Sequence, residues 1–301
     1  MSLSSAVVRL TPILFVLLWS TGFIGSKLGA PYSEPLTFLV LRYIAVLVVL
    51  GGSMLAMRPA RGMSVSDCLH AMVVGVLIHG VYLGAVFWAI DHDMPAGVAA
   101  LIVGLQPVVT ALFAGVLLGE RITAKHWIGM ALGLIGITLV LGPKAGVAGA
   151  GIDAATVGVC ATGVLGITLG TIYQKRFAQQ MDMRGGVTFQ YVGAFIVTLA
   201  AALVLEDFQV EWSGQFLFAL GWLVLVLSIG AVTLLMMLIR KGAVSKVATL
   251  FYLVPAATAV ESYFLFGEEL GIVQLVGMAI VIGAVALASR TPAAAPPATT
   301  T

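Results

Sequence analysis

Apolar segments long enough to cross a membrane follow one another along almost the whole chain, and they constrain its fold more than any other feature. A helix of about 20 residues spans the ~30 Å hydrocarbon core of a bilayer and satisfies its own backbone hydrogen bonds. The segments lack the alternation of apolar and polar residues that a transmembrane β-barrel requires. The sequence therefore predicts an all-α membrane protein with ten transmembrane helices. These predicted spans cover residues 11–29, 35–56, 67–90, 96–118, 126–142, 154–174, 186–205, 216–239, 246–266 and 271–289.

Composition agrees with lipid as the solvent for most of the chain. Of the 301 residues, 60% are hydrophobic and only 9% are charged, whereas a soluble domain carries about 25% charged residues. The net charge is +2 and the Lys and Arg residues are scattered, so we expect no nucleic-acid partner. Cys68 and Cys160 lack the spacing of a zinc site or a disulfide framework. We expect neither a metal nor a cofactor.

The distribution of Lys and Arg predicts the orientation, because cytoplasmic loops of membrane proteins are enriched in these residues. With the amino terminus inside, twelve of the 15 Lys and Arg residues fall on the inner side and only Lys144 falls in an outer loop. Lys27 and Arg42 are left within spans or at their edges. We therefore expect both termini in the cytoplasm.

The chain contains an internal repeat. A shift of 148 residues places Pro107 on Pro255 and the segment 119–120 on 267–268, with Gly-Glu in both. The same ungapped register matches residues in four of the spans of each half, so the chain reads as two copies of a five-span unit. Because five is odd, the copies cross the membrane in opposite orientations, which is typical of alternating-access carriers. The predicted units are residues 1–148 and 149–290, followed by a disordered tail at 291–301.

Four segments carry a resemblance to a known family: LLWSTGFIGSKLG (17–29), PLTFLVLRY (35–43), PVVTALFAGVLLGERIT (107–123) and PAATAVESYFLFGEELG (255–271). Over nearly its whole length the chain resembles the EamA family of the drug/metabolite transporter superfamily, and within it the YddG-type exporters of amino acids and metabolites. The resemblance implies a multi-pass protein of the bacterial inner membrane. It also implies small-molecule efflux through a central cavity lined mainly by spans 1, 3, 4, 6, 8 and 9.

Polar side chains deep in the spans are candidates for substrate binding, because such groups normally face the bundle interior or a wet cavity. His79 lies about halfway along span 3, and helical spacing places Tyr82 on the same face. His79 is able to hydrogen-bond a substrate carboxylate or to carry a proton. The alternative is a neutral His that bonds to a neighbouring helix. Trp19, Gln106 and Tyr252 complete the set of residues expected to bind substrate.

Pro107 in span 4 and Pro255 in span 9 occupy matching positions of the two repeats. A proline inside a helix frees a backbone carbonyl one turn earlier. A pair of broken helices at matching positions points to the binding site of a carrier, and a plain packing kink is the alternative.

Glu261 is the only acid deep in a span, and we expect it to pair with Arg42 of span 2 or with Lys27 near the outer end of span 1. An unpaired charge in hydrocarbon costs several kcal/mol, which favours such a pair. A fixed pair would act as a structural latch at an outer gate. An unpaired Glu261 would instead be a proton or substrate site.

Together these features favour an inner-membrane transporter that exports amino acids or similar small metabolites by alternating access. Cations are scarce at the predicted midplane, so we expect a neutral or zwitterionic solute; a monomeric chain is consistent with the sequence. One alternative is a carrier for drugs, nucleosides or sugar-nucleotides. An intramembrane enzyme is a second alternative, but the sequence has no HExxH pair and no nucleophile–His motif. A non-transporting scaffold has no feature in its favour.

Overall fold

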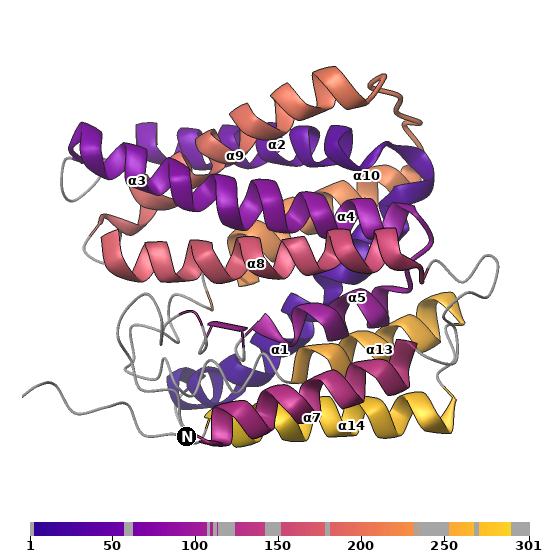
Figure 1. Ribbon diagram of the computed structural model, residues 1–301. Helices are drawn as coiled ribbons and strands as arrows, with labels where there is room; N and C mark the ends of the chain where they lie inside the picture. The colour runs from indigo at the N-terminus through magenta and orange to yellow at the C-terminus, as the bar shows by residue number, and fades with distance from the viewer. Residues whose placement is uncertain are drawn as a thin grey trace, which may run out of the picture.

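The structure is a computed structural model, and the residues that it describes are almost entirely helical (Figure 1). The described residues are 3–56, 63–106, 109–110, 113, 124–141, 152–177, 181–231, 234, 253–267 and 271–289. Within these ranges no strand forms, and the only extended pairing is an isolated antiparallel bridge between Ser33 and Val210. The prediction of an all-α protein is confirmed for this part of the chain. The predicted tail at 291–301 lies outside it.

Fourteen helical elements cover the described residues. They are α1 (Leu3–Gly29), η1 (Ala30–Tyr32), α2 (Pro35–Ala56), α3 (Val65–Gly75), η2 (Val76–Leu83), α4 (Gly84–Asp91), α5 (Ala96–Val103), α7 (Ala124–Leu141), α8 (Ala154–Phe177), α9 (Met183–Leu205), α10 (Gly214–Gly221), η4 (Trp222–Ala231), α13 (Val254–Phe266) and α14 (Ile272–Ser289). The element η1 is a short 3-10 helix, whereas η2 and η4 are π-helices.

Six helical segments among the described residues are long and apolar enough to cross a membrane. They are Ile13–Tyr32, Pro35–Gly52, Val65–Asp91, Ala154–Phe177, Gly185–Leu205 and Gly214–Ala231. Each of the ten predicted spans overlaps at least one described helix. The count of ten crossings, the cytoplasmic termini and the boundaries of the two units stay predictions.

Two of the membrane-length segments contain a π-helix. The element η2 lies between α3 and α4, and η4 continues α10. A shift of 148 residues carries Val76–Leu83 onto residues 224–231, which lie inside η4. The widened turn therefore occurs at matching positions of the two repeats. π-Helical turns are rare and are frequently found at functional sites.

Helices from the two halves of the sequence pack along each other (Figure 1). In particular, α7 packs on α14, α3 on α9, α8 on η2, and α1 on α13. Glycines give α3 and α9 their close approach: a Cβ at Gly75 would lie 2.6 Å from Gln190 Cα, and a Cβ at Gly193 would lie 2.7 Å from Met72 Cα. Small residues allow such backbone proximity between membrane helices.

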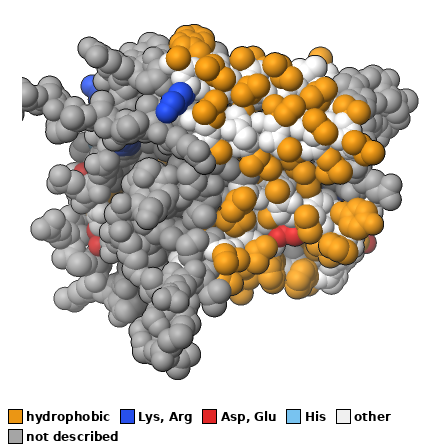
Figure 2. Space-filling view, turned by 90° about the horizontal axis from the view of Figure 1, so that it is seen from below, with side chains coloured by type: hydrophobic (Ala, Val, Ile, Leu, Met, Phe, Trp, Pro, Cys, Tyr) orange, Lys and Arg blue, Asp and Glu red, His pale blue; other side chains and the backbone are white. Residues whose placement is uncertain are grey.

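The outer faces of the helices are apolar. Figure 2 views the molecule from the side of α7 and α14, and hydrophobic side chains cover most of the described surface there. An extensive exposed apolar surface requires an apolar solvent or partner. Lipid meets this requirement for a bundle of membrane-length helices. The exposed residues of this face include Trp127, Ile128, Leu134, Ile135, Ile272, Val273, Leu275 and Val276.

Two carboxylates hold one end of the bundle together. Glu206, just after α9, accepts hydrogen bonds from the backbone N–H groups of Leu36 (2.8 Å) and Thr37 (2.7 Å) in the first turn of α2. In return, Glu34 accepts bonds of 3.2 and 2.9 Å from two backbone N–H groups that follow α9. A carboxylate at a helix N-terminus satisfies otherwise unpaired N–H groups and interacts favourably with the helix dipole. We call this end of the molecule the Glu34–Glu206 end.

Candidate functional site

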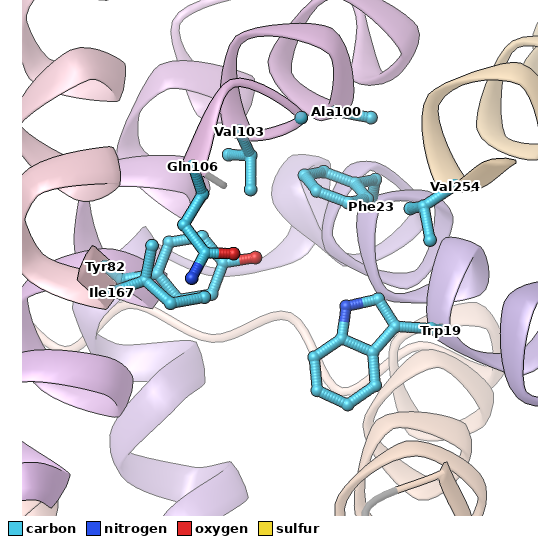
Figure 3. Close-up of a pocket in the computed structure, with 9 residues that line it drawn as sticks. Trp19, Phe23, Tyr82, Ala100, Val103, Gln106, Ile167 and Val254 are labelled. Carbon is cyan, nitrogen blue, oxygen red and sulfur yellow. The ribbon is translucent and has the colours of Figure 1, made fainter. Parts of the chain in front are cut away.

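A central cavity lies between helices of both repeats (Figure 3). The space inside it that is open to water-sized molecules is about 20 Å³, and its empty volume is about 330 Å³ when open space at the mouth is included. Most of the wall is apolar, and Trp19, Tyr82 and Gln106 contribute side chains with polar atoms. The lining residues are Trp19, Phe23, Tyr82, Ala100, Val103, Gly104, Gln106, Ile167 and Val254.

The lining comes from five of the six spans that the family resemblance implies. From the first repeat, α1, η2 and the segment from α5 to Gln106 contribute; from the second, α8 contributes Ile167 and α13 contributes Val254. None of the described residues of span 8, the remaining implied span, is in this wall. A chamber shared by the two repeats changes shape whenever one repeat moves against the other.

Two helix ends meet at the cavity wall. The helix α5 ends at Val103 with Gly104 as its cap, and α13 begins at Val254 with Pro255 in its first turn. A Cβ on Gly104 would lie 2.9 Å from Pro255 Cγ, so glycine permits this close approach. In the first turn, proline costs no intrahelical hydrogen bond. The described part of span 9 has Pro255 in the first turn of α13, whereas the part before Leu253 and Pro107 lie outside the described residues, so the break at these prolines stays a prediction.

Three of the five residues predicted to bind substrate line the cavity, namely Trp19, Tyr82 and Gln106. In Figure 3 the Trp19 ring faces the Gln106 side chain and Tyr82 across the open space. Tyr252 lies outside the described residues. The contact of these side chains with a substrate stays a prediction.

His79 is separated from Tyr82, although helical spacing predicts one shared face. The His79 ring stacks on Tyr191 of α9, with ring centroids 4.5 Å apart and planes 12° apart, and His79 is not in the cavity wall. The π-helix explains the difference: residues three apart diverge by about 60° in an α-helix but by roughly 115° in the wider π-turn. The sequence carries no signal of that turn.

Contacts of the charged side chains in the spans differ from the predicted pair of Glu261 with Arg42, and the alternative pair of Glu261 with Lys27 stays a prediction. Glu261 Oε1 accepts a 2.7 Å hydrogen bond from the Ser20 hydroxyl of α1, and Arg42 donates to the Ser228 hydroxyl of η4. The Lys27 ammonium lies 5.1 Å from the centre of the Phe266 ring. The predicted pair of Glu261 with Arg42 is wrong, because α13 packs on α1 and α5 whereas α2 packs on α9, α4 and η4.

Sequence reasoning missed the apolar lining residues and the two serines that bond the charges. The spans are apolar on nearly every side, so the pattern does not distinguish a cavity-facing Phe23 or Ile167 from a lipid-facing side chain. A small polar residue in a span, such as Ser20 or Ser228, is the one signal that was available.

The fold and the shared cavity define a helical membrane protein built from two repeats around a central chamber. The family described as "EamA-like transporter family" matches the chain twice, over residues 9–142 and again over residues 155–290. The chain belongs to this family, and hence to the drug/metabolite transporter superfamily. It is a multi-pass protein of the bacterial inner membrane, and the resemblance deduced from the sequence is confirmed.

Relatives of similar length have transporter names. An uncharacterized transporter of Bacillus subtilis is 25% identical over 90% of this chain and 88% of its own length. An uncharacterized inner membrane transporter of Escherichia coli is 24% identical over 90% and 87%, and a Salmonella typhimurium protein named "Probable amino-acid metabolite efflux pump" is 24% identical over 90% and 90%. A solved crystal structure aligns with a TM-score of 0.64 at 21% identity, over 95% of this chain and 98% of that one. It supports the fold alone.

Proposed function

We propose that this protein exports amino acids or similar small metabolites across the inner membrane by alternating access. In this mechanism two inverted repeats rock about the central cavity, which opens to each side of the membrane in turn. We infer that the activity is transport rather than catalysis.

The observation that carries the proposal is the cavity wall shared by both repeats. Trp19, Tyr82 and Gln106 belong to the first repeat, whereas Ile167 and Val254 belong to the second. A solute in this chamber touches both moving units, so its binding energy differs between the two end states. The close approach of Gly104 at the end of α5 to Pro255 in the first turn of α13 also supports the proposal, because helix ends near a shared chamber are typical of carriers.

The wall favours a small solute with an apolar part. Phe23, Val103 and Ile167 supply apolar surface, and few polar groups orient the ligand, which is the usual design of a small-molecule site. The name of the Salmonella typhimurium relative favours amino-acid metabolites among such solutes. A drug or a nucleoside also has apolar surface, and the experiment below separates these classes.

The test is solute flux into liposomes that contain the purified protein. The panel includes amino acids, nucleosides, cationic drugs and nucleotide-sugars. Saturable amino-acid flux supports the proposal. Flux of another class alone refutes the assignment to amino acids, and no flux of any class refutes transport of these solutes.

Conservative variants with matched controls connect the flux to the cavity. Tyr82→Phe removes one hydroxyl from the wall, and Tyr263→Phe removes the same group from a 53% exposed position on α13. Trp19→Phe has its match in Trp127→Phe, which is 55% exposed on α7. We expect a changed KM in the two cavity variants and unchanged kinetics in the two controls. Equal kinetics in all four would contradict a transport route through this cavity.

A further inference from the structure

A buried guanidinium with unused hydrogen-bond donors lies between the two repeats. Arg42 of α2 is only 3% exposed. Its Nε and Nη2 both donate to the hydroxyl of Ser228 in η4, at 3.2 and 3.0 Å. Its Nη1 is buried and has no partner among the described residues. In the same part of the chain, no carboxylate lies within ion-pair distance of this side chain.

The unused donors of Arg42 form a fork. A guanidinium carries five N–H groups in one plane. The Ser228 hydroxyl accepts from Nε and from one N–H of Nη2, which leaves the other N–H of Nη2 and both N–H groups of Nη1. One N–H on each of these nitrogens points off the end of the group in parallel. This pair matches the spacing of the two oxygens of a carboxylate.

Residue counts along the helices place the partner of the guanidinium further from the Glu34–Glu206 end than the Arg42 backbone. Arg42 lies seven residues from the Glu34–Glu206 end of α2, or about 10 Å at 1.5 Å per residue. Ser228 lies fourteen residues from the same end of the molecule along α10 and η4, or about 20 Å. The bonds to Ser228 therefore hold the charge inward from the Arg42 backbone, away from the Glu34–Glu206 end.

The surroundings of Arg42 are polar and belong to both repeats. His79 of η2 stacks on Tyr191 of α9, and the Tyr43 hydroxyl donates a 2.7 Å bond to the His79 carbonyl oxygen. Arg42 precedes Tyr43 in α2, and the Tyr43 bond to His79 joins α2 to η2, which also carries Tyr82. Tyr82 also lines the central cavity, so it connects this cluster to the chamber. Both π-helices take part, η2 through His79 and η4 through Ser228.

We propose that Arg42 binds the carboxylate of the transported solute, whose apolar part lies in the cavity against Trp19 and Phe23. This inference rests on the proposed function and specifies its substrate class. A cation buried without an anion is costly, and a carboxylate removes that cost while the protein is loaded. One guanidinium matches a single negative charge and not the two charges of a pyrophosphate. The carboxylate belongs either to a zwitterionic amino acid or to a simple organic acid.

Equilibrium binding tests this site independently of flux. Thermal stabilisation of the purified full-length protein gives an apparent Kd for triplets of matched compounds. One triplet is phenylalanine, 3-phenylpropanoate and 2-phenylethylamine; another is leucine with the corresponding acid and amine. We expect at least one triplet in which a carboxylate-bearing member binds at least about tenfold tighter than the amine. The tighter of the amino acid and the acid identifies the source of the carboxylate. The proposal is overturned if, in every triplet, the amine binds as tightly as the carboxylate-bearing compounds. It is also overturned if no carboxylate-bearing compound binds.

Variants separate a binding role of Arg42 from a structural one. In Arg42→Gln the ratio of the amine Kd to the carboxylate Kd should fall toward one. In Arg42→Lys this ratio should be intermediate, because the charge stays but the fork of parallel N–H groups is lost. Lys27→Gln removes a different cation of the spans and should leave the preference unchanged. A preference that persists in a folded Arg42→Gln overturns the proposal. If Arg42→Gln does not fold, the proposal is tested by whether the unmodified protein binds carboxylate-bearing compounds more tightly than the matching amines.

The outcomes also distinguish this inference from the proposed export. Binding that is selective for carboxylates without any flux refutes export and leaves the Arg42 site standing. Flux of amines at the same rate as their parent amino acids refutes the Arg42 site and leaves transport standing.

Discussion

Gly75→Ala tests the packing that joins the two repeats. Gly75 ends α3, and a Cβ placed there would lie 2.6 Å from Gln190 Cα of α9, whereas ordinary contacts begin at about 3.4 Å. The backbone of α9 would therefore have to retreat by at least roughly 0.8 Å in an interior packed as densely as a crystal. Overpacking of this kind costs about 1–3 kcal/mol. This cost exceeds the gain of up to about 1 kcal/mol that alanine brings to a helix interior.

The matched control for Gly75→Ala is Gly158→Ala in α8, where the new Cβ meets nothing within 4 Å. Melting of the purified protein in detergent, followed by size exclusion, provides the assay. We expect Gly75→Ala to lower the melting temperature by about 1.5–2 °C for each kcal/mol lost, and Gly158→Ala to leave it unchanged or raise it. The shift also displaces Gln190 and the neighbouring Tyr191, which stacks on His79, so the flux should fall. A Gly75→Ala protein as stable and active as the parent would refute the close packing of α3 on α9.

Two further predictions concern helix caps. Glu206→Ala removes the acceptor of two backbone N–H groups at the start of α2 and should cost about 0.5–2 kcal/mol; the exposed Glu211→Ala is the control, and equal melting temperatures would contradict the cap. Asp153 precedes α8, and hydrogen bonds from the Thr156 backbone and hydroxyl hold the pKa of its carboxyl below the usual 3.8. A carboxyl whose pKa is depressed by folding stabilises the folded state when the pH is above its unfolded-state pKa. This stabilisation is lost as the pH falls through the folded-state pKa. The melting temperature of the parent should therefore decline relative to that of Asp153→Asn between about pH 5 and pH 2, and a difference independent of pH would show that the carboxylate contributes nothing.

The helical class and the repeat were predictable because both depend on local properties of the sequence. An apolar run long enough to span a bilayer has few alternatives to a helix. A duplication appears as matched residues at a constant shift, as with Pro107 and Pro255. The pattern at Trp19, Tyr82 and Gln106 was also informative, because a polar or amphipathic side chain is costly against lipid and turns inward.

The faces and the partners of these helices were not predictable in the same way. His79 and Tyr82 diverge because η2 is a π-helix, and nothing in residues 76–83 signals the wider turn. The close approach of Pro255 in α13 to Gly104 at the end of α5 is a tertiary feature that the sequence does not indicate. Opposite charges within spans suggest an ion pair from the sequence alone. In the structure, however, Glu261 accepts a hydrogen bond from Ser20, and Arg42 donates to Ser228.

The sequence by itself determined that this chain lies in a membrane as two related sets of helices, since hydrophobic length and internal repetition are read along the chain. Only the tertiary structure decided which face of each helix borders the cavity and where the Arg42 charge is held. These features depend on which helices are neighbours. A helix that is apolar on every side does not specify its neighbours, and small differences in close packing select among them.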